Sequence, residues 1–365
     1  MLRFIHAADW HLDSAFGALP APQAARRRRE SRETPVRLAE YVRSHDIDLV
    51  LLAGDLLDTG SAFRETTEVL AAAFARMAVP VLIAPGNHDC AVPGGLWDTA
   101  EWPENVHIFR ESRMTAVEFP QWNLTVHGAG FTAPDCTESL LSGFTAPTDG
   151  RVHIGLLHGE GEAAEARYNL IRRQDIAASG LAYLALGHIH KRMEPQKSGD
   201  TLWAWPGCME GRGFDELGEK GFYEGVIAGD GAVTLQFVPF ARRRYEILTV
   251  DVTGKDPRAA VEEALPADTA DHLYRILLTG ETGEAGVNIA ALQEALAERF
   301  WALEVRDHTR MAEDVWARAE EDSLRGLFLR DLRGRMERAA TAEERETITR
   351  AARFGLAALD RRDLG

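Results

Sequence analysis

The chain has 365 residues, of which 45% are hydrophobic, and it carries a formal net charge of −16 at pH 7. That length suits two or three domains with a sizeable core, and no apolar run approaches the roughly 20 residues that cross a bilayer. The acidic balance argues against a protein that coats nucleic acid nonspecifically, but it does not exclude a nuclease. Three cysteines without metal-binding spacing, and the lack of a secretion signal, predict a cytoplasmic protein that uses no membrane.

Strand and helix patterns alternate over the first 240 residues. Five apolar runs are typical of buried strands, at residues 2–8, 49–53, 79–84, 152–157 and 181–186. Segments 33–44 and 62–77 are typical of helices, and this alternation predicts a parallel sheet with crossover helices. Further along, a short strand at 201–205 and a hairpin made of 221–228 and 232–238 predict a second sheet. We therefore expect an α/β fold with a two-sheet sandwich as its core.

The same patterns predict three segments. Residues 1–240 form the larger domain, and the arginine run Arg242–Arg244 marks its end. Residues 241–311 show strand and helix patterns in the order β-α-β-α-β, which predicts a smaller second domain. Residues 312–365 are predicted to be a wholly helical tail.

The last helix of that tail has a recognisable start. Thr341 followed by Glu344 forms a capping box, in which each side chain bonds the backbone of the other residue. One face of this helix carries Ile348, Ala352, Leu356 and Leu359. Such a stripe is most often packed against its own protein, and the alternative is docking to a partner or to a second copy of the chain.

Five short polar motifs follow the predicted strands. They are Asp9-Trp10-His11, Gly54-Asp55-Leu56-Leu57-Asp58, Gly86-Asn87-His88-Asp89, His158-Gly159 and Gly187-His188-Ile189-His190. Residues at the carboxyl ends of parallel strands converge on the crevice where α/β sheets bind their ligands. The motifs supply Asp, His and Asn but no cysteine, a set that suits two divalent cations such as manganese, iron or zinc.

The motifs also indicate how such a pair of ions is held. Hydrolysis of a phosphate ester needs an activated water and a neutralised phosphoryl group, which two metals about 3.5–4 Å apart can supply. The pair needs a bridging carboxylate, and Asp55 is the natural candidate because Gly54 lets the backbone turn tightly at a strand end. Side chains two residues apart on extended backbone can face one ion or divide between two. The other candidate ligands are Asp9, His11, Asn87, His158, His188 and His190.

His88 stands beside a candidate ligand but is not needed as one. We predict that it stabilises the phosphoryl oxygens and protonates the leaving group as the general acid. That role requires an orienting carboxylate. Asp58, three residues after Asp55, is the favoured candidate, and Asp89 is the alternative.

Three basic clusters are candidates for phosphate contact: Arg26–Arg29 with Arg32, Arg172-Arg173, and Arg242–Arg244. Each has an alternative interpretation as ordinary exposed surface. Only the first cluster lies near a site motif in the sequence, so its members Arg26, Arg27, Arg28 and Arg29 are the predicted DNA contacts. Arg212, from a later segment, is a further predicted DNA contact.

Other histidines and tryptophans are expected to be structural. His6, His107, His127 and His153 lie in or near apolar segments without a motif around them. Trp203 and Trp205 alternate on a predicted strand and could offer a stacking face to nucleic acid, but core packing is the favoured interpretation.

The motifs resemble those of the calcineurin-like metallophosphoesterase superfamily. The opening stretch 4–12 and the stretch 54–60 are similar to its DNA repair exonuclease branch, the SbcD/YhaO-type nuclease subunits. Residues 206–213 with 216–221 resemble the YhaO type most. The resemblance is firm over residues 1–240, fair over 245–310 and weak in the tail.

This resemblance implies a ligand set and partners. Asp9, His11, Asp55 and His190 would hold one metal, and Asp55, Asn87, His158 and His188 would hold the other. His88 would be the catalytic acid, manganese the usual cation, and DNA the substrate. Family members work with a structural-maintenance-type ATPase that docks on helical segments beyond the nuclease domain, and residues 245–310 match the family's DNA-capping domain. The archaeal and eukaryotic nucleases carry histidine in place of Asp58, whereas phosphatases of the wider superfamily carry aspartate, which widens the range of substrates.

Three functions follow from these observations. The leading one is a metal-dependent DNA exonuclease or endonuclease that uses two metals in double-strand-break repair or end processing. The alternative is a small-molecule or nucleotide phosphodiesterase or phosphatase on the same site, which the acidic charge favours. A binding module without catalysis would be expected to lack one or more ligands, and this chain keeps them all.

Overall fold

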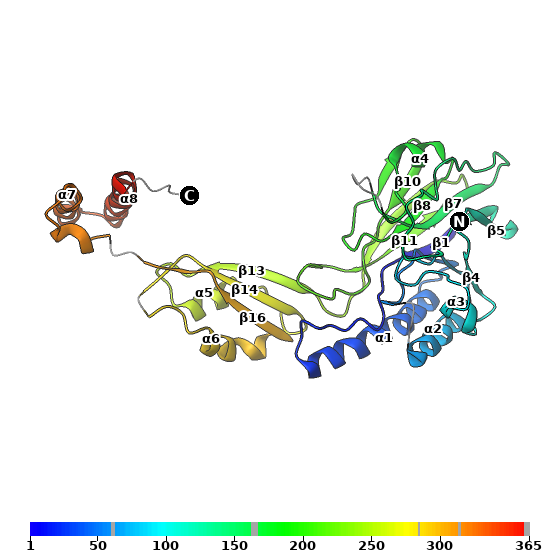
Figure 1. Ribbon diagram of the computed structural model, residues 1–365, viewed down its shortest axis with the longest axis horizontal. Coiled ribbons are helices and arrows are strands. Elements are labelled where there is room, and N and C mark those ends of the chain that lie inside the picture. The colour runs from blue at the N-terminus through cyan, green and yellow to red at the C-terminus, as the bar shows by residue number, and fades with distance from the viewer. Residues whose placement is uncertain (60–62, 162–166, 284, 313–314, 361–365) are drawn as a thin grey trace. The chain divides into compact units, whose positions relative to one another are not determined.

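The structure is a computed structural model that describes residues 1–59, 63–161, 167–283, 285–312 and 315–360 (Figure 1). Its first sheet contains six strands: Leu2–Ala7 (β1), Leu49–Leu52 (β2), Val81–Ile83 (β3), Val106–Ile108 (β4), Gly221–Ile227 (β11) and Val233–Pro239 (β12). Their order is β12-β11-β1-β2-β3-β4. Strands β1 to β4 are parallel, whereas β11 runs antiparallel to both β1 and β12.

The second sheet also contains six strands: Thr115–Phe119 (β5), Leu124–Gly128 (β6), Val152–His158 (β7), Tyr183–Gly187 (β8), Gln196–Ser198 (β9) and Thr201–Ala204 (β10). Their order is β5-β6-β7-β8-β10-β9. The four central strands β6, β7, β8 and β10 are parallel, and the edge strands β5 and β9 are antiparallel to their neighbours.

The two sheets pack face to face, as the sandwich prediction requires. Side chains from both sheets share one buried cluster, in which Phe4 and Leu51 of the first sheet meet Val126 and Leu156 of the second. Burial of about 1.5–3 kcal/mol per large apolar side chain makes this interface a main source of stability. The α/β sandwich expected from the sequence is confirmed.

Helices cover the outer faces of the sheets. The long helix Ala21–Ser44 (α1) packs beside Arg64–Met77 (α2) against the first sheet, with Leu38 and Phe74 fully buried (Figure 1). The short helix Arg173–Ala178 (α4) packs Ile176 against the second sheet. The remaining short elements of this part of the chain are Leu96–Thr99 (α3) and the 3-10 turn Pro120–Trp122 (η1).

Two details differ from the sequence prediction. The hairpin β11–β12 was expected to belong to a second sheet, but it extends the first sheet by pairing with the open edge of β1. A hairpin pattern identifies which two strands pair with each other, not which sheet edge they cover. Helix α1 begins at Ala21, twelve residues before the predicted start, and it continues through Pro35. Its arginine-rich first half shows no helical spacing of apolar residues, because Arg27 and Glu30 are among the side chains that it buries.

A second set of elements follows residue 244. It comprises Tyr245–Asp251 (β13), Pro257–Ala264 (α5), Leu273–Thr279 (β14), Ile289–Leu296 (α6), Ala297–Arg299 (η2) and Ala302–Asp307 (β16). The three longer strands form one sheet in the order β13-β14-β16, and Glu281–Thr282 (β15) pairs with Arg310–Met311 (β17). The predicted β-α-β-α-β order is therefore confirmed.

The described part of the tail is mainly helical, as predicted, with turns before Leu324, and residues 313–314 and 361–365 lie outside the described residues. After the 3-10 turn Ala317–Glu320 (η3), helices Leu324–Arg338 (α7) and Ala342–Asp360 (α8) pack together through Leu329, Leu332 and Ala352. Ile348 and Leu356 pack against the same cluster, so much of the predicted apolar stripe faces its own hairpin. The capping box forms: the Thr341 hydroxyl accepts from the Glu344 N–H at 3.1 Å, and Glu344 accepts from the Thr341 N–H at 3.3 Å.

By its internal contacts the chain divides into two compact units. The first comprises residues 1–248, 266–276 and 295–304, and the second comprises 249–265, 277–294 and 305–365. Within the ranges that the structure describes, no helix is both long and apolar enough to span a membrane.

Candidate metal centre

The five motifs meet at one end of the sandwich, within the first unit. They follow β1, β2 and β3 of one sheet and β7 and β8 of the other, so the parallel strands of both sheets deliver them to the same edge. Three groups of side chains there have ligand atoms within 4.8 Å of one another: Asp9, His11 and His190; Asp55, His158 and His188; and His11, Asp58 and His88.

The backbone of this region is strained at the residues that carry the site. Asp9, His11, Asp55 and His188 have φ values of 54°, 43°, 51° and 98°, in the left-handed region that non-glycine residues rarely adopt. Such conformations cost on the order of 1–3 kcal/mol each and are retained mainly where a function needs them. Gly54 has a φ of 83°, and a Cβ there would lie 2.7 Å from the His158 ring, so only glycine fits.

One cluster of possible metal-ligand atoms, the His158 group, consists of Asn87 Oδ1, His158 Nε2 and His188 Nδ1. The distances between these atoms are 3.1, 3.2 and 3.3 Å. His158 Nδ1 lies 2.8 Å from the Ala53 carbonyl oxygen, so this nitrogen carries the ring hydrogen and donates it outward. The lone pair of Nε2 therefore faces the oxygen of Asn87. Lone pairs that converge in this way repel one another unless a cation lies between them.

A second cluster, the His190 group, consists of Asp9, His11 and His190. His11 Nε2 and His190 Nε2 lie 3.0 Å apart. His190 Nδ1 lies 2.7 Å from Glu216 Oε1, and it donates its hydrogen there, which leaves Nε2 as an acceptor facing His11. The Asp9 carboxylate accepts the backbone N–H of His188 at 3.0 Å, in the loop that carries one histidine of each cluster.

Asp55 lies between the two clusters. Its Oδ2 atom is 3.7 Å from His11 Nε2 and 3.5 Å from His158 Nε2, while Oδ1 accepts the backbone N–H of His88 at 2.9 Å. One carboxylate oxygen thus faces both groups of donor atoms. This is the position that a bridging ligand occupies between two cations.

The spacing and charge of these atoms fit divalent cations. Ligands bound to one ion at about 2.0–2.2 Å in tetrahedral or octahedral geometry lie roughly 3.0–3.5 Å apart, close to the distances observed. Burial, followed by repulsion from Asp55, raises the pKa of Asp9 well above its usual range, and a cation would relieve that cost. Burial lowers the pKa of His158 to about 3 and that of His188 to about 4, so both rings are neutral at pH 7 and able to bind metal.

His88 lies at the exposed edge of the centre. Its ring packs edge-on against His11, with the ring centroids 4.8 Å apart. Its Nδ1 atom lies 2.9 Å from the backbone carbonyl oxygen of Asp58 and donates a hydrogen bond to it. Asp58 therefore contacts His88 through its backbone, while its carboxylate lies 3.3 Å from His11 Nδ1.

Asp89, the alternative orienting residue, is buried and serves another purpose. Its carboxylate accepts backbone N–H groups from Gly86 and Leu56, each at 2.8 Å, and from Asp55 at 3.3 Å. It therefore fixes the loop that carries Asp55 to the loop that carries Asn87 and His88.

The predicted arginine contacts differ in their environment. Arg27 is fully buried, and its guanidinium group donates to Glu30, Glu210 and the Gly211 carbonyl at 3.0–3.1 Å. Its donors are directed at these protein acceptors and not at solvent. Arg26 and Arg29 are exposed on α1, and Arg28 donates to the Ala15 carbonyl at 2.9 Å. Arg212 lies inside the centre.

His6, His127, His153, Trp203 and Trp205 are buried, as expected of structural residues, whereas His107 is exposed. His6 is fully buried between the Tyr183 hydroxyl and the Leu186 carbonyl, and His127 pairs with His153 at 2.9 Å. Trp203 and Trp205 are both buried. His107 lies on β4, beside Phe109.

Sequence reasoning missed two residues of this region. Glu216 was noted only as part of a family stretch, yet its carboxylate orients His190. Trp205 was assigned to the core, yet its Nε1 donates to the carbonyl oxygens of Gly159 at 3.1 Å and Gly187 at 2.9 Å. These glycines adjoin His158 and His188, so the indole ties two ligand loops together. Neither contact has a local sequence signal, because each joins residues from different loops.

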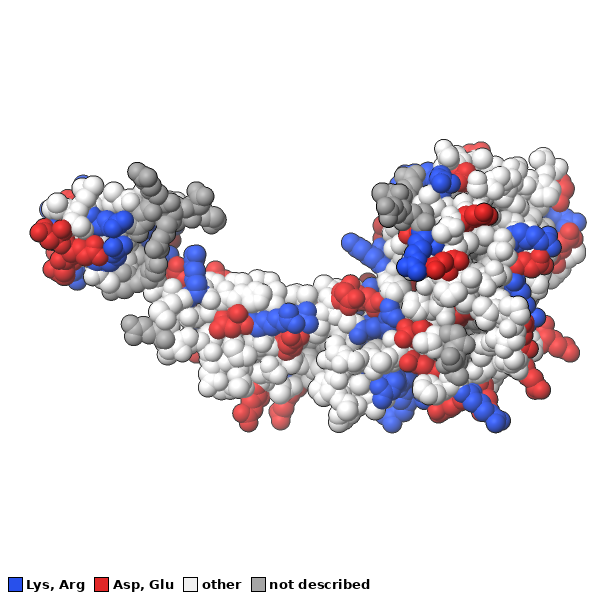
Figure 2. All heavy atoms as spheres, viewed as in Figure 1, with Lys and Arg blue, Asp and Glu red and all other residues white. Residues whose placement is uncertain are grey.

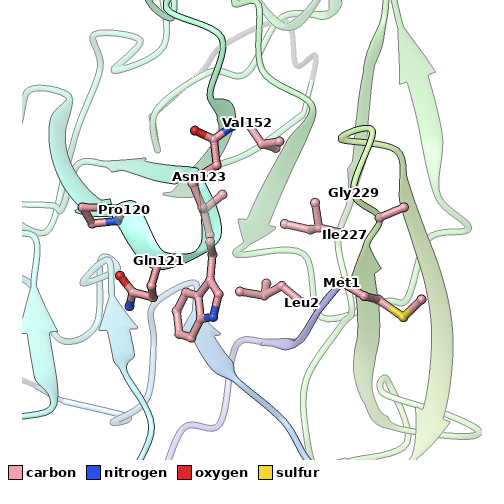
Figure 3. A pocket seen from close by; sticks show the side chains of 11 residues that line it. Met1, Leu2, Pro120, Gln121, Asn123, Val152, Ile227 and Gly229 are labelled. Carbon is pink, nitrogen blue, oxygen red and sulfur yellow. The ribbon is translucent and has the colours of Figure 1, made fainter.

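The pocket in Figure 3 is separate from this centre. It has a volume of about 310 Å³ and is lined in part by Leu2 and Val152, the first residues of β1 and β7. It thus lies at the amino ends of the strands, whereas the motifs lie at their carboxyl ends. The described residues that line it include no histidine, cysteine, aspartate or glutamate.

Comparison with known proteins agrees with this geometry. The chain belongs to the calcineurin-like phosphoesterase family, whose model matches residues 2–192. It is 33% identical over 341 residues to a protein of Bacillus subtilis strain 168 named "Uncharacterized metallophosphoesterase YhaO", covering 84% of this chain and 82% of that one. The protein is thus a metallophosphoesterase, a hydrolase with a metal-binding site.

More distant relatives were also found. A protein of Methanopyrus kandleri named "DNA double-strand break repair protein Mre11" is 24% identical over 288 residues, covering 70% of this chain and 60% of its own length. The crystal structure of TT1561 from Thermus thermophilus aligns with a TM-score of 0.38 and 10% identity, over 65% of this chain and 98% of that one. The structural alignment is too weak to support an inference.

Proposed function

We propose that the protein is a metal-dependent nuclease that hydrolyses DNA phosphodiester bonds, as an exonuclease or endonuclease, in double-strand-break repair or end processing. The observation that carries this proposal is the position of Asp55, whose single Oδ2 atom faces two separate groups of donor atoms. A cation pair around a shared carboxylate is what two-metal hydrolysis of a phosphate ester requires. Manganese is the preferred cation, and iron and zinc are the alternatives.

In this proposal the two groups of donor atoms hold one ion each. Asp9, His11, Asp55 and His190 would hold the first, and Asp55, Asn87, His158 and His188 would hold the second. When bound, the ions neutralise phosphoryl charge and lower the pKa of water. The protein's own contribution is to hold the seven side chains in fixed positions, which the buried loop contacts of Asp89 and Trp205 support.

His88 acts as the general acid. Because Nδ1 donates to the Asp58 carbonyl, the ring is held with Nε2 directed away from that contact and available to a leaving oxygen. The side chain is exposed, whereas the proposed ligands are buried or half-buried, so a large substrate can reach it.

DNA is the proposed substrate because of two features beyond the metal centre. One is the similarity to a relative named as a DNA double-strand break repair protein. The other is the segment 241–311, which we propose is a capping domain that positions DNA, since a small ester needs no such addition. Acidic and basic side chains are interspersed on the face shown in Figure 2, so the cations and a few exposed arginines such as Arg26 and Arg29 would meet the phosphates.

A second candidate is a phosphodiesterase or phosphatase that acts on nucleotides or other small molecules. The net charge of −16 favours it, because a strongly acidic protein repels a long polyanion. Both candidates use the same centre and differ only in the substrate that reaches it.

For partners, we propose a structural-maintenance-type ATPase that docks on the helical tail. Leu324 and Leu327 of α7 and Phe354 of α8 are 68%, 60% and 56% exposed, and they offer this partner apolar contact area. A second copy of this chain is the alternative occupant.

The test uses purified protein with manganese and end-labelled single-stranded and duplex DNA. Metal-dependent cleavage that disappears in Asp55→Asn is the expected result. The matched substrates are a small phosphodiester and a small phosphomonoester. Turnover of these with no cleavage of either DNA would contradict the nuclease proposal and favour the second candidate.

A further inference from the structure

Arg212 joins two carboxylates that lie behind the His190 group. Its Nη1 atom donates to Asp58 Oδ1 at 3.1 Å, and its Nη2 atom donates to Glu216 Oε1 at 2.8 Å. Its backbone N–H also donates to Glu216 Oε2, at 2.8 Å. One planar guanidinium group therefore fixes two carboxylates that are 154 and 4 residues away in sequence.

Each of these carboxylates faces the outer nitrogen of one histidine of the group. Glu216 Oε1 lies 2.7 Å from His190 Nδ1, and Asp58 Oδ1 lies 3.3 Å from His11 Nδ1. The inner nitrogens of the same two rings lie 3.0 Å apart, facing Asp55 and Asp9. Glu216 thereby fixes the tautomer and orientation of His190, as a carboxylate does for a metal-binding histidine. Asp58 lies at ion-pair distance from His11 Nδ1 without a hydrogen bond to it.

The His158 group is oriented differently. There, His158 Nδ1 donates to the backbone carbonyl of Ala53, and neither of the two carboxylates that Arg212 holds takes part. A change at Arg212 therefore reaches the two groups unequally. This asymmetry makes its role measurable.

The carboxylate of Glu216 is largely buried, and a buried charge needs a partner of opposite charge such as Arg212. The side chain of Glu216 is 7% exposed and that of Arg212 is 22% exposed, so this pair is largely removed from water. Although burial opposes it, hydrogen bonds from His190 and Arg212 keep the pKa of Glu216 well below its usual range. A planar guanidinium can serve two carboxylates at once, whereas the ammonium of lysine is a single point charge.

We propose that Arg212 is a positioning residue for one of the two cations, and that it acts by holding Glu216 and Asp58 against His190 and His11. It was predicted from the sequence as a DNA contact, but its donors are already directed at these carboxylates. The inference rests on the dinuclear centre proposed above. It adds that the two cation sites depend on Arg212 to different degrees.

The experiment is a manganese titration of metal-free protein, followed by electron paramagnetic resonance, which distinguishes free, single and paired ions. Wild type is expected to bind two ions. Arg212→Lys is expected to keep one site at wild-type affinity and to weaken the other by about 10–100-fold. The coupled signal of the pair should then disappear at manganese concentrations that fill both wild-type sites.

Arg151→Lys is the matched control. Arg151 also bridges two carboxylates, Glu118 at 2.6 Å and Asp149 at 3.7 Å, but it lies just before β7, at the end away from the motifs. It should leave both manganese sites unchanged. Glu216→Gln provides a second route to the same conclusion, since it removes one of the two held carboxylates and should weaken the same single site.

Three outcomes would overturn the inference. Wild-type affinity at both sites in Arg212→Lys, with a raised KM for DNA, would make Arg212 a substrate contact. Equal weakening of both cation sites in Arg212→Lys and Glu216→Gln would show that these contacts stabilise the whole centre and not one site. Fewer than two manganese ions in wild type would remove the centre itself. By contrast, two ions without DNA cleavage would count only against the nuclease proposal, because this titration uses no substrate.

Discussion

The buried carboxylate of Asp89 accepts the backbone N–H of Leu56 at 2.8 Å, and so joins the loop after β3 to the loop after β2. The same carboxylate accepts the N–H of Gly86 at 2.8 Å within its own loop. These two loops carry Asp55, Asn87 and His88. The spacing of the proposed bridging ligand, a terminal ligand and the general acid therefore depends on one side chain that touches no substrate.

Replacing Asp89 by alanine should destabilise the protein markedly. The change leaves buried backbone N–H groups without an acceptor, and each unsatisfied group lowers the free energy of unfolding by about 1–3 kcal/mol. Thermal unfolding of the metal-free protein measures the loss. The matched control is Asp98→Ala, because Asp98 also accepts a loop N–H, from Gly94 at 3.0 Å, but in an exposed position. If both variants lost the same small amount, Asp89 would not be the anchor described here.

Asp55→Asn and Asn87→Ala should separate the two cation sites. Asn tolerates the left-handed backbone at position 55, so the fold should persist. Loss of the shared charge should weaken both ions, whereas loss of the Asn87 oxygen should weaken only the ion held by His158 and His188. Metal content after dialysis reports both effects. A stoichiometry that falls by one ion in both variants would contradict the bridging position of Asp55.

His88→Gln should slow turnover without removing metal. A general acid contributes typically 10²–10⁴-fold, so kcat should fall by about that factor. Metal content and the thermal unfolding midpoint should stay at wild-type values, because the ring is exposed and makes one backbone hydrogen bond. Loss of bound metal in this variant would show that His88 is a ligand instead.

Trp205→Phe should reduce activity through the ligand loops. The variant keeps most of the buried ring but loses the N–H that donates to Gly159 and Gly187. We expect a loss of about 1–3 kcal/mol in the free energy of unfolding and weaker binding at the His158 group. Trp203→Phe is the control, since its N–H donates to Ser198 Oγ at 3.0 Å, away from the ligand loops. Equal metal affinity in the two variants would contradict the role assigned to Trp205.

The contribution of two buried histidines to the stability of the metal-free protein should fall as the pH drops below about 6.5. Burial lowers the pKa of His6 to about 3 and that of His127 to about 4, from 6.5 in the unfolded chain. Between these values the unfolded chain binds protons that the folded chain does not, so acid favours unfolding, and the contribution of these two histidines is complete above pH 6.5. Each such histidine contributes a slope of about 1.4 kcal/mol per pH unit.

Denaturant unfolding at several pH values between 4 and 7 would measure that slope. His6→Gln should reduce the dependence of unfolding free energy on pH by the contribution of one histidine, whatever its effect on stability at pH 7. A slope that does not change in His6→Gln would show that His6 is not held neutral in the folded protein.

The sequence by itself determined the identity of the proposed ligands and much of the architecture. Apolar runs followed by Asp, His and Asn are local patterns, and parallel strands bring their carboxyl ends to one edge whatever the order of the sheet. The position of Asp55 between the two groups follows from that rule and from the glycine before it. The capping box at Thr341 was equally local, because both partners lie within one helical turn.

Only the tertiary structure decided which sheet received the hairpin β11–β12, how far α1 extends, and which carboxylates orient which rings. Arg27 belongs to a basic run in the sequence, yet its charge is buried against Glu210, 183 residues away. Glu216, Arg212 and Trp205 act through contacts with other loops of the fold. The energies that decide such contacts come from desolvation and hydrogen bonding between those loops, and residue order alone carries no local signal for them.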